Sequence, residues 1–245
     1  MNIRKIRLVL LLATGLTAAS ASAARAQAGA TIDSEKFLNV SLGSQFTTHG
    51  FTSATSFPLY DETATISTSQ TVGHGVVFDV SGGYRLTDRL FVALGLSTFH
   101  SAGDATVAAS IPDPIFVNRH LATTAIASDM GQTTVAVNFQ AVYMLPLTDR
   151  MDLSFFLGPS ILHVKQDFVS ATVASGTQNL SINPSGESAT TAKAGTLGFD
   201  LSYKVTGPFR AGIFVRYAGG KVDLPSRADL KVGGVQYGVG IRTRF

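Results

Sequence analysis

Cysteine and tryptophan are absent from the chain, and charged residues are scarce. Without cysteine the protein has no disulfide bond and no thiolate for catalysis or metal binding, which excludes a small disulfide-stabilised scaffold. Charged side chains make up 14% of the 245 residues, compared with roughly 25% in soluble domains. Yet beyond the N-terminal segment no apolar run reaches the roughly 18 residues that a membrane-spanning helix needs. This balance fits neither a typical soluble domain nor a helical membrane protein.

Residues 1–26 are predicted to be a signal peptide that is removed on export. Three basic residues precede an apolar run at 8–16, and Ala21–Ala23 or Ala24–Ala26 supplies a small-residue cleavage site. The run is too short to be a membrane anchor. Without this segment Lys+Arg falls from 19 to 15 while Asp+Glu stays at 16, so the net charge changes from +3 to −1. The mature chain is therefore not basic, and we expect no nucleic-acid binding.

A strict alternation of large apolar and small or polar residues is clearest at 76–96. From Val76 to Leu86 every second residue is large or apolar, apart from one glycine, and the pattern resumes at Leu90 after a short polar connection. A helix would place Asp79 and Gly83 on the same face as Val76. The stretch therefore predicts a β-hairpin with one face toward lipid and one toward a crowded, polar interior.

The same pattern recurs along the chain and predicts its architecture. It gives eight strands, three tight turns and four longer loops, and the tetrapeptide Leu-Thr-Asp-Arg occupies two of the turns. Short turns on one side and long loops on the other are typical of outer-membrane barrels. The predicted fold is all-β, an eight-stranded antiparallel up-and-down transmembrane β-barrel with short periplasmic turns and long extracellular loops. Residues 27–36 are expected to form a short periplasmic lead and residues 37–245 the barrel domain.

The leader, the eight alternating strands, the turn and loop order and the final stretch 237–245 together resemble the small OmpA/OmpX-type outer-membrane barrel family. The resemblance implies a location in the outer membrane of a Gram-negative-type bacterium, in contact with lipid and lipopolysaccharide. It also implies that Tyr237 and Phe245 form a signal for the barrel-assembly machinery during insertion. We expect a monomer with no peptidoglycan-binding domain after Phe245.

Aromatic residues recur at outward positions near the strand ends. Tyr217 and Tyr237 lie eight positions above Phe209 and Phe245, a climb of roughly 20 Å at a strand tilt of about 40°. The apolar band of such barrels is roughly 25 Å tall, so both interfaces would carry aromatic rings. Phe and Tyr are also common strand residues in general. The predicted girdle consists of Tyr84, Tyr143, Tyr203, Phe209, Tyr217, Tyr237 and Phe245.

The inward positions carry a set of charged residues with two possible roles. They could line a narrow passive pore with a weak anion preference, or they could pair with one another in a filled lumen. An eight-stranded barrel is only just wide enough to be filled by side chains, and buried charges need partners, so we favour a plugged lumen. The candidate residues are Asp79, Arg85, Asp152, Asp200, Lys204, Arg210, Arg216, Arg242 and Arg244.

An enzymatic role is not expected. Some barrels of this size modify lipid A with a His, a Ser and a carboxylate, and here His100-Ser101 lies near Asp104, with His163 on another strand. The residues around His100 lack the asparagine found in lipid A deacylases. No metal-ligand spacing, phosphate loop or nucleotide motif occurs, so no cofactor or metal is expected.

The long segments 48–73, 101–130 and 170–193 are the remaining candidates for function. They are rich in Ser, Thr, Ala and Gly, and longer than hairpin connections need to be. Two interpretations stay open. They are either a hydrated surface without a dedicated ligand or a surface for a host, phage or matrix partner.

Overall fold

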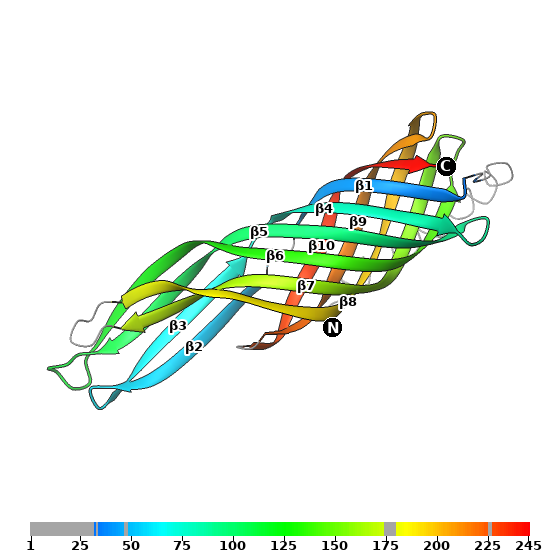
Figure 1. The fold of residues 1–245 in the computed structure, drawn as a ribbon. Coiled ribbons are helices and arrows are strands. Elements are labelled where there is room, and N and C mark those ends of the chain that lie inside the picture. Colours follow the sequence, from blue (N-terminus) through cyan, green and yellow to red (C-terminus); the bar gives the residue numbers. More distant parts are fainter. Residues whose placement is uncertain (1–31, 33, 47–48, 174–179, 225–226) are drawn as a thin grey trace, which may run out of the picture.

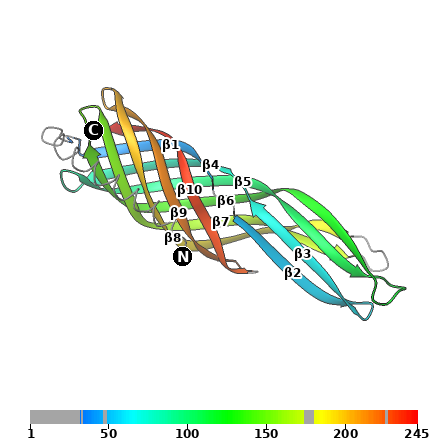
Figure 2. The same cartoon turned by 180° about the vertical axis from the view of Figure 1, so that it is seen from behind.

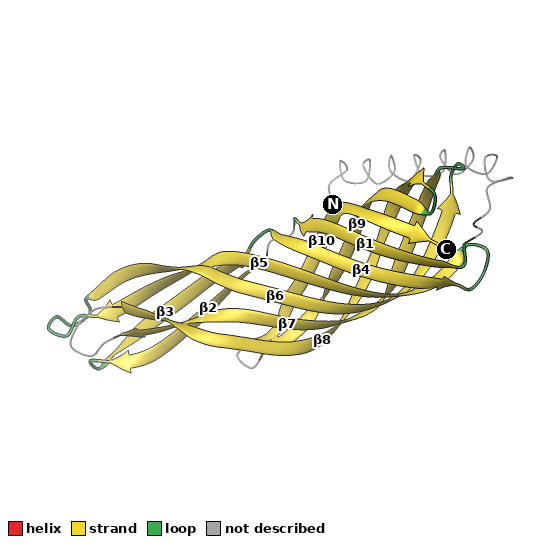
Figure 3. Cartoon of the chain, turned by 45° about the horizontal axis from the view of Figure 1, so that its top comes forward, coloured by secondary structure: helices red, strands yellow, loops and turns green. Residues whose placement is uncertain are grey.

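The computed structural model describes residues 32, 34–46, 49–173, 180–224 and 227–245, so the predicted signal peptide and most of the lead lie outside it (Figure 1). In these residues every regular element is a β-strand (Figure 3). No helix among them is long and apolar enough to cross a membrane. The strands are β1 Lys36–Gln45, β2 His49–Leu59, β3 Glu62–Val72, β4 Gly75–Arg85, β5 Leu90–Pro112, β6 His120–Pro146, β7 Met151–Val173, β8 Leu180–Thr206, β9 Phe209–Leu224 and β10 Arg227–Arg244.

Eight of these strands form a closed antiparallel ring. β1 pairs with β4 on one side and with β10 on the other, and β4 to β10 follow one another in chain order. At the seam the β1–β10 register places Phe37 opposite Arg244, and the amide of Lys36 donates to the carbonyl of Phe245 at 2.8 Å. The closed ring leaves no unpaired edge within the barrel. The predicted eight-stranded barrel is confirmed.

The two Leu-Thr-Asp-Arg segments form equivalent tight turns. The hydroxyl oxygen of Thr148 accepts the amide of Met151 at 3.0 Å, and that of Thr87 accepts the amide of Leu90 at 3.3 Å. A threonine side chain that bonds a backbone amide a few residues later stabilises such turns. The third turn contains Gly207, whose φ of 50° falls in the left-handed region that glycine adopts without strain.

The long segments 48–73, 101–130 and 170–193, predicted as loops, are instead mostly paired strands. Residues 49–72 form the β2–β3 hairpin, and the other two segments lengthen β5, β6, β7 and β8 beyond the barrel. The fourth predicted loop, at about 218–231, is likewise mostly strand, because β9 and β10 continue and pair there. The prediction was wrong because alternating Ala, Ser and Thr differ little in hydrophobicity and so give only a weak strand pattern. In the folded protein the neighbouring strand, already in register, offers backbone hydrogen bonds that let each strand continue.

The extended strands form a second structural unit, here called the extension, at the end opposite the tight turns (Figures 1 and 2). β3 pairs with β5 between Thr65 and Gln70, which adds the β2–β3 hairpin to the β5–β6 sheet. The side-chain amide of Gln70 donates to the carbonyl of Asp167 in β7 at 3.2 Å. An apolar cluster outside the barrel holds the unit together and consists of Ile66, Val107, Ala109 and Ile111, with Phe57, Leu59, Val169 and Ala171 packed against it.

The orientation can be tested by single-cysteine labelling, because the native chain has no cysteine. Val117 lies in the β5–β6 connection and is 79% exposed, and Asp88 is exposed in the β4–β5 turn. On intact cells a membrane-impermeant maleimide should label Val117→Cys and leave Asp88→Cys unmodified until the outer membrane is permeabilised. Labelling of Asp88→Cys from outside would show the opposite orientation.

Candidate functional site: the barrel lumen

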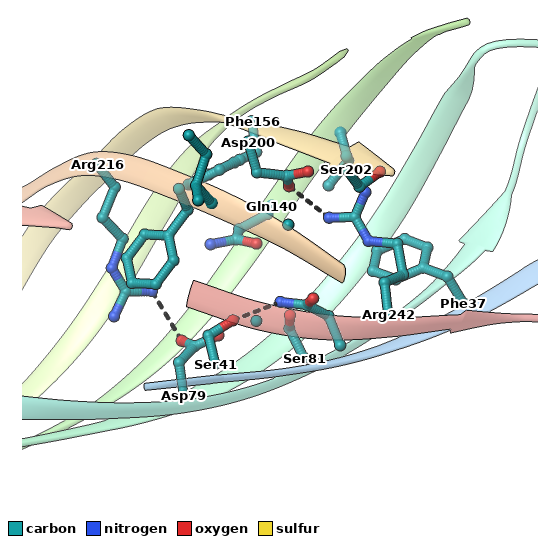
Figure 4. A pocket seen from close by; sticks show the side chains of 16 residues that line it. Phe37, Ser41, Asp79, Ser81, Gln140, Phe156, Asp200, Ser202, Arg216 and Arg242 are labelled. Atoms are coloured by element: carbon teal, nitrogen blue, oxygen red, sulfur yellow. Dashed lines mark hydrogen bonds and ion pairs between the residues drawn. The ribbon is translucent and has the colours of Figure 1, made fainter. Parts of the chain in front are cut away.

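The central layer of the lumen is a chain of polar contacts that starts at Asp79 of β4. Its Oδ2 lies 2.7 Å from Nη1 of Arg216, which comes from β9 on another side of the ring (Figure 4). Nε of Arg216 donates to Gln236 at 2.7 Å, and the amide of Gln236 donates to Gln45 at 3.0 Å. All four side chains are nearly fully buried. A buried charge pair needs such additional hydrogen bonds to offset its desolvation.

A second pair joins Arg242 of β10 to Asp200 of β8. Nη1 of Arg242 also donates to the hydroxyl of Ser154 at 2.8 Å, and its guanidinium lies 5.2 Å from the ring centroid of Phe37. Side chains from β7, β8 and the start of β1 therefore hold this arginine. Figure 4 shows both arginines pointing into the lumen from different strands.

The third cluster of charges, nearest the periplasmic end, consists of Asp152 of β7 and two arginines. Asp152 pairs with Arg210 and lies 3.1 Å from Nη1 of Arg244. Asp152 is 2% exposed. Nη2 of Arg244 also donates to the sulfur of Met144 at 3.3 Å. Two guanidinium groups around one buried carboxylate leave a local excess of positive charge.

Two residues of the predicted charge set lie outside these pairs. Lys204 is exposed at the end of β8, and none of the ion pairs among the described residues includes it. Arg85 is half-buried and donates to the carbonyl of Ile32 in the lead rather than to a carboxylate. Both lie beside a tight turn, where an inward position meets the mouth of the barrel and solvent. The prediction for Lys204 as a member of the lumen network was therefore wrong.

A cluster of buried apolar residues lies at the periplasmic end of the lumen, and the sequence reasoning missed it. Ile32 of the lead, Phe91 of β5 and Met144 of β6 are between 0% and 6% exposed. The sequence did contain a sign of this cluster, because Phe91 and Ala93 both occupy inward positions of the alternating strand. The full cluster consists of Ile32, Phe37, Phe91, Ala93, Val142 and Met144, with Phe156 packed against it.

Further layers fill the lumen toward the extracellular side. Asn138 donates to Ser97 at 3.1 Å and accepts a hydrogen bond from Ser160 at 2.7 Å, and Ser160 also bonds Thr196 at 2.8 Å. Val77 packs on Phe99 nearby. A separate apolar cluster consists of Ala136, Leu162, Val164, Ala192 and Val232.

Two small cavities lie between these layers in the described part of the barrel. One cavity of about 40 Å³ is lined by Asp79, Asp200, Arg216 and Arg242 among others (Figure 4). Another of about 30 Å³ is lined by Arg216, Gln45 and Gln236 among others. A cavity needs about 10–15 Å³ to hold one water molecule, so each has room for a few. Arg216 contributes to the walls of both.

The seven predicted girdle residues all lie on the outward face, between 37% and 64% exposed. Tyr237 stacks on Phe46 with a centroid distance of 4.2 Å and an interplanar angle of 15°. Phe46, 57% exposed at the end of β1, is an aromatic that the girdle prediction omitted. Phe245 directly follows β10, and its backbone exchanges hydrogen bonds with that of Lys36 across the seam.

A family model described as "Outer membrane protein beta-barrel domain" matches residues 9–243. The chain belongs to this family. It is accordingly an outer-membrane protein of a Gram-negative-type bacterium.

Comparison with solved structures gives similar barrels at low sequence identity. Neisserial surface protein A is 13% identical, with 86% of this chain and 96% of that chain covered and a TM-score of 0.48. OprG of Pseudomonas aeruginosa is 12% identical, with 89% and 98% covered and a TM-score of 0.41. Ail of Yersinia pestis is 13% identical, with 86% and 99% covered and a TM-score of 0.39. A search of curated proteins gives no match.

The histidine and serine considered for catalysis in this outer-membrane barrel do not meet. His100 faces outward and its Nδ1 lies 3.1 Å from the hydroxyl of Thr133, whereas Ser101 is buried and donates to the carbonyls of Gly73 and His74. Successive residues of a strand point to opposite faces, so they cannot form a dyad. No group of three or more metal-ligating side chains occurs among the described residues.

Breaking one lumen pair tests how dry the interior of the barrel is. We expect Asp200→Ala to lower the free energy of unfolding by roughly 3–5 kcal/mol, because Arg242 loses its carboxylate in a buried site. Equilibrium unfolding in lipid vesicles measures the change, and Asp88→Ala in the exposed turn serves as the control. A loss within roughly 0–1 kcal/mol would mean that water screens the pair.

Proposed function

We propose that this outer-membrane protein is a non-conducting, non-enzymatic barrel with a structural or surface-interaction role. The observation that carries the proposal is the stacking of closed layers in the lumen. The apolar cluster around Phe91 lies at the periplasmic end, the layer of Arg216 in the middle, and the clusters around Asn138 and Leu162 above them. Ions would have to displace paired charges and apolar side chains in succession.

The extension supports the surface-interaction part of the proposal. It has its own apolar core, so it can hold a defined shape beyond the barrel. Its β5–β6 connection is also ordered by Asp113, which accepts the amides of Ile115 at 2.9 Å and Phe116 at 3.2 Å and pairs with Arg119. The hydrogen bond from Ile115, assisted by Arg119 and Phe116, holds the pKa of Asp113 below its usual value. Exposed apolar side chains at the same tip, Ile115 and Val117, offer contact area to a partner.

A narrow passive porin is the second candidate. The observation in its favour is the cavity between the Asp79–Arg216 and Asp200–Arg242 pairs, which has room for water inside the lumen. A weak anion preference would come from the excess of arginine around Asp152.

Single-channel recording in a planar bilayer separates the two candidates. We expect the wild-type protein to give no stable conductance steps, because several layers close the lumen. A double variant that removes two layers, Phe91→Ala with Arg216→Ala, should conduct, while the lipid-facing control Phe139→Ala should not. Stable, anion-selective steps from the wild type would support the porin instead.

The role of the extension can be separated from that of the barrel. Replacing residues 50–71 by a short Gly-Ser connection should leave outer-membrane levels and heat-modifiable gel migration unchanged, because the eight-strand ring does not include β2 or β3. Ile66→Asp, which disrupts the apolar core of the extension, should behave in the same way. Loss of the folded barrel in both variants would mean that the extension serves assembly rather than interaction.

A further inference from the structure

The distal end of the extension exposes several large apolar side chains to solvent. Ile115 is 79% exposed, Phe116 53% and Val117 79%, and the three follow one another in the β5–β6 connection. Tyr60, in the turn between β2 and β3, is 40% exposed. Both connections lie at the end of the molecule opposite the tight turns (Figures 1 and 2). The surface formed by Tyr60, Ile115, Phe116 and Val117 is here called the apolar tip.

The apolar tip lies well beyond the membrane that holds the barrel. β5 is 23 residues long, and a strand tilted by about 40° crosses an apolar band of roughly 25 Å in about ten residues. The rest of β5 carries the tip roughly 30 Å farther, whereas the headgroup region on each side of a bilayer is only about 5–8 Å thick. The lipids of its own membrane therefore do not cover these side chains.

The backbone amides of the β5–β6 connection find acceptors within the connection itself. The amide of Asp113 donates to the carbonyl of Arg119 at 2.7 Å. Oδ1 of Asp113 accepts the amides of Ile115 at 2.9 Å and Phe116 at 3.2 Å, and Pro114 has no amide hydrogen. An apolar environment requires backbone groups to be satisfied in this way. The connection can therefore leave water without losing these hydrogen bonds.

The charges beside the apolar tip include an exposed group of each sign. The side chain of Arg119 is 63% exposed, and its guanidinium lies 4.4 Å from the ring centroid of Phe116. Asp61 is exposed in the β2–β3 turn. These two residues adjoin Asn118 and Glu62, whose hydrogen bond of 2.7 Å joins the two connections. A zwitterionic headgroup, which has a phosphate and a quaternary ammonium group, is complementary to such a pair.

We propose that the apolar tip inserts into the outer leaflet of an opposing zwitterionic bilayer, such as one of phosphatidylcholine. Ile115, Phe116 and Val117 enter the boundary between headgroups and acyl chains, and the guanidinium beside them donates to a lipid phosphate. A folded protein partner would need a matching pocket, whereas a bilayer accepts a narrow apolar loop without one. The inference deepens the surface-interaction role proposed above and rests on it.

The test measures binding of the full-length protein in nanodiscs to protein-free phosphatidylcholine vesicles by flotation. Ile115→Ser should weaken binding roughly 10-fold, because one large aliphatic side chain is lost from the apolar contact. The matched control is Ile126→Ser, which removes an isoleucine that is 66% exposed on β6 away from the tip and should keep wild-type affinity. Heat-modifiable migration verifies that each variant is folded.

A fluorescent label gives a second readout that does not depend on affinity. A polarity-sensitive fluorophore on Val117→Cys should shift to shorter wavelength when vesicles are added. The same fluorophore on Ala54→Cys, exposed in the middle of β2, should not shift. Replacing half of the phosphatidylcholine by anionic phosphatidylglycerol should not strengthen binding, because the carboxylates near the tip, those of Asp61, Glu62 and Asp113, outnumber the guanidinium of Arg119.

Several outcomes would overturn the proposal. They are a wild-type protein that does not bind the vesicles, equal weakening by Ile126→Ser, and stronger binding to the anionic vesicles. Pairing of nanodiscs without vesicles would identify a second copy of the chain as the occupant instead. If vesicles do not bind but Ile115→Ser reduces attachment of intact bacteria to cultured cells, the partner is a protein and the surface-interaction role stands. If neither measurement responds, the surface-interaction role fails as well.

Discussion

The narrowness of an eight-stranded ring is the constraint on which the rest of this structure depends. Every inward side chain meets others from across the barrel, so an inward charge must find a partner and an inward aromatic must find space. Asp79 and Arg216 satisfy the first condition, and Phe214 satisfies the second. The ring of Phe214 lies over Gly43 and Gly238, where a Cβ would approach it to 2.9 and 2.8 Å.

The same constraint explains why the lumen is layered. Long side chains from several strands occupy successive levels of the lumen, and cavities of about 40 and 30 Å³ lie among them. Charged pairs in such a place are costly to form but more costly to break. They therefore specify which strands face each other more than they add net stability.

The residues on the outward face of the barrel are determined instead by contact with the bilayer. Large apolar residues cover the band, and aromatic rings mark its edges. Beyond the apolar band the strands face water, and their outward positions are rich in Ser, Thr and Ala. There the strands continue as a sheet stabilised by its own cluster around Ile66 and Val107.

Periodicity along the chain was enough to predict the barrel, because an alternating strand needs no knowledge of its partner to show which face meets lipid. The parity of Asp79, Arg216 and Tyr237 was readable for this reason. Which charges meet was decided only by the tertiary structure: Asp79 and Arg216 are 137 positions apart, and strand order and stagger bring them together. The extended hairpins at 49–72 and the loss of Lys204 to solvent were also beyond the sequence. The extended hairpin depends on a neighbouring strand in register. The exposure of Lys204 depends on how close its inward position lies to the open end of the ring.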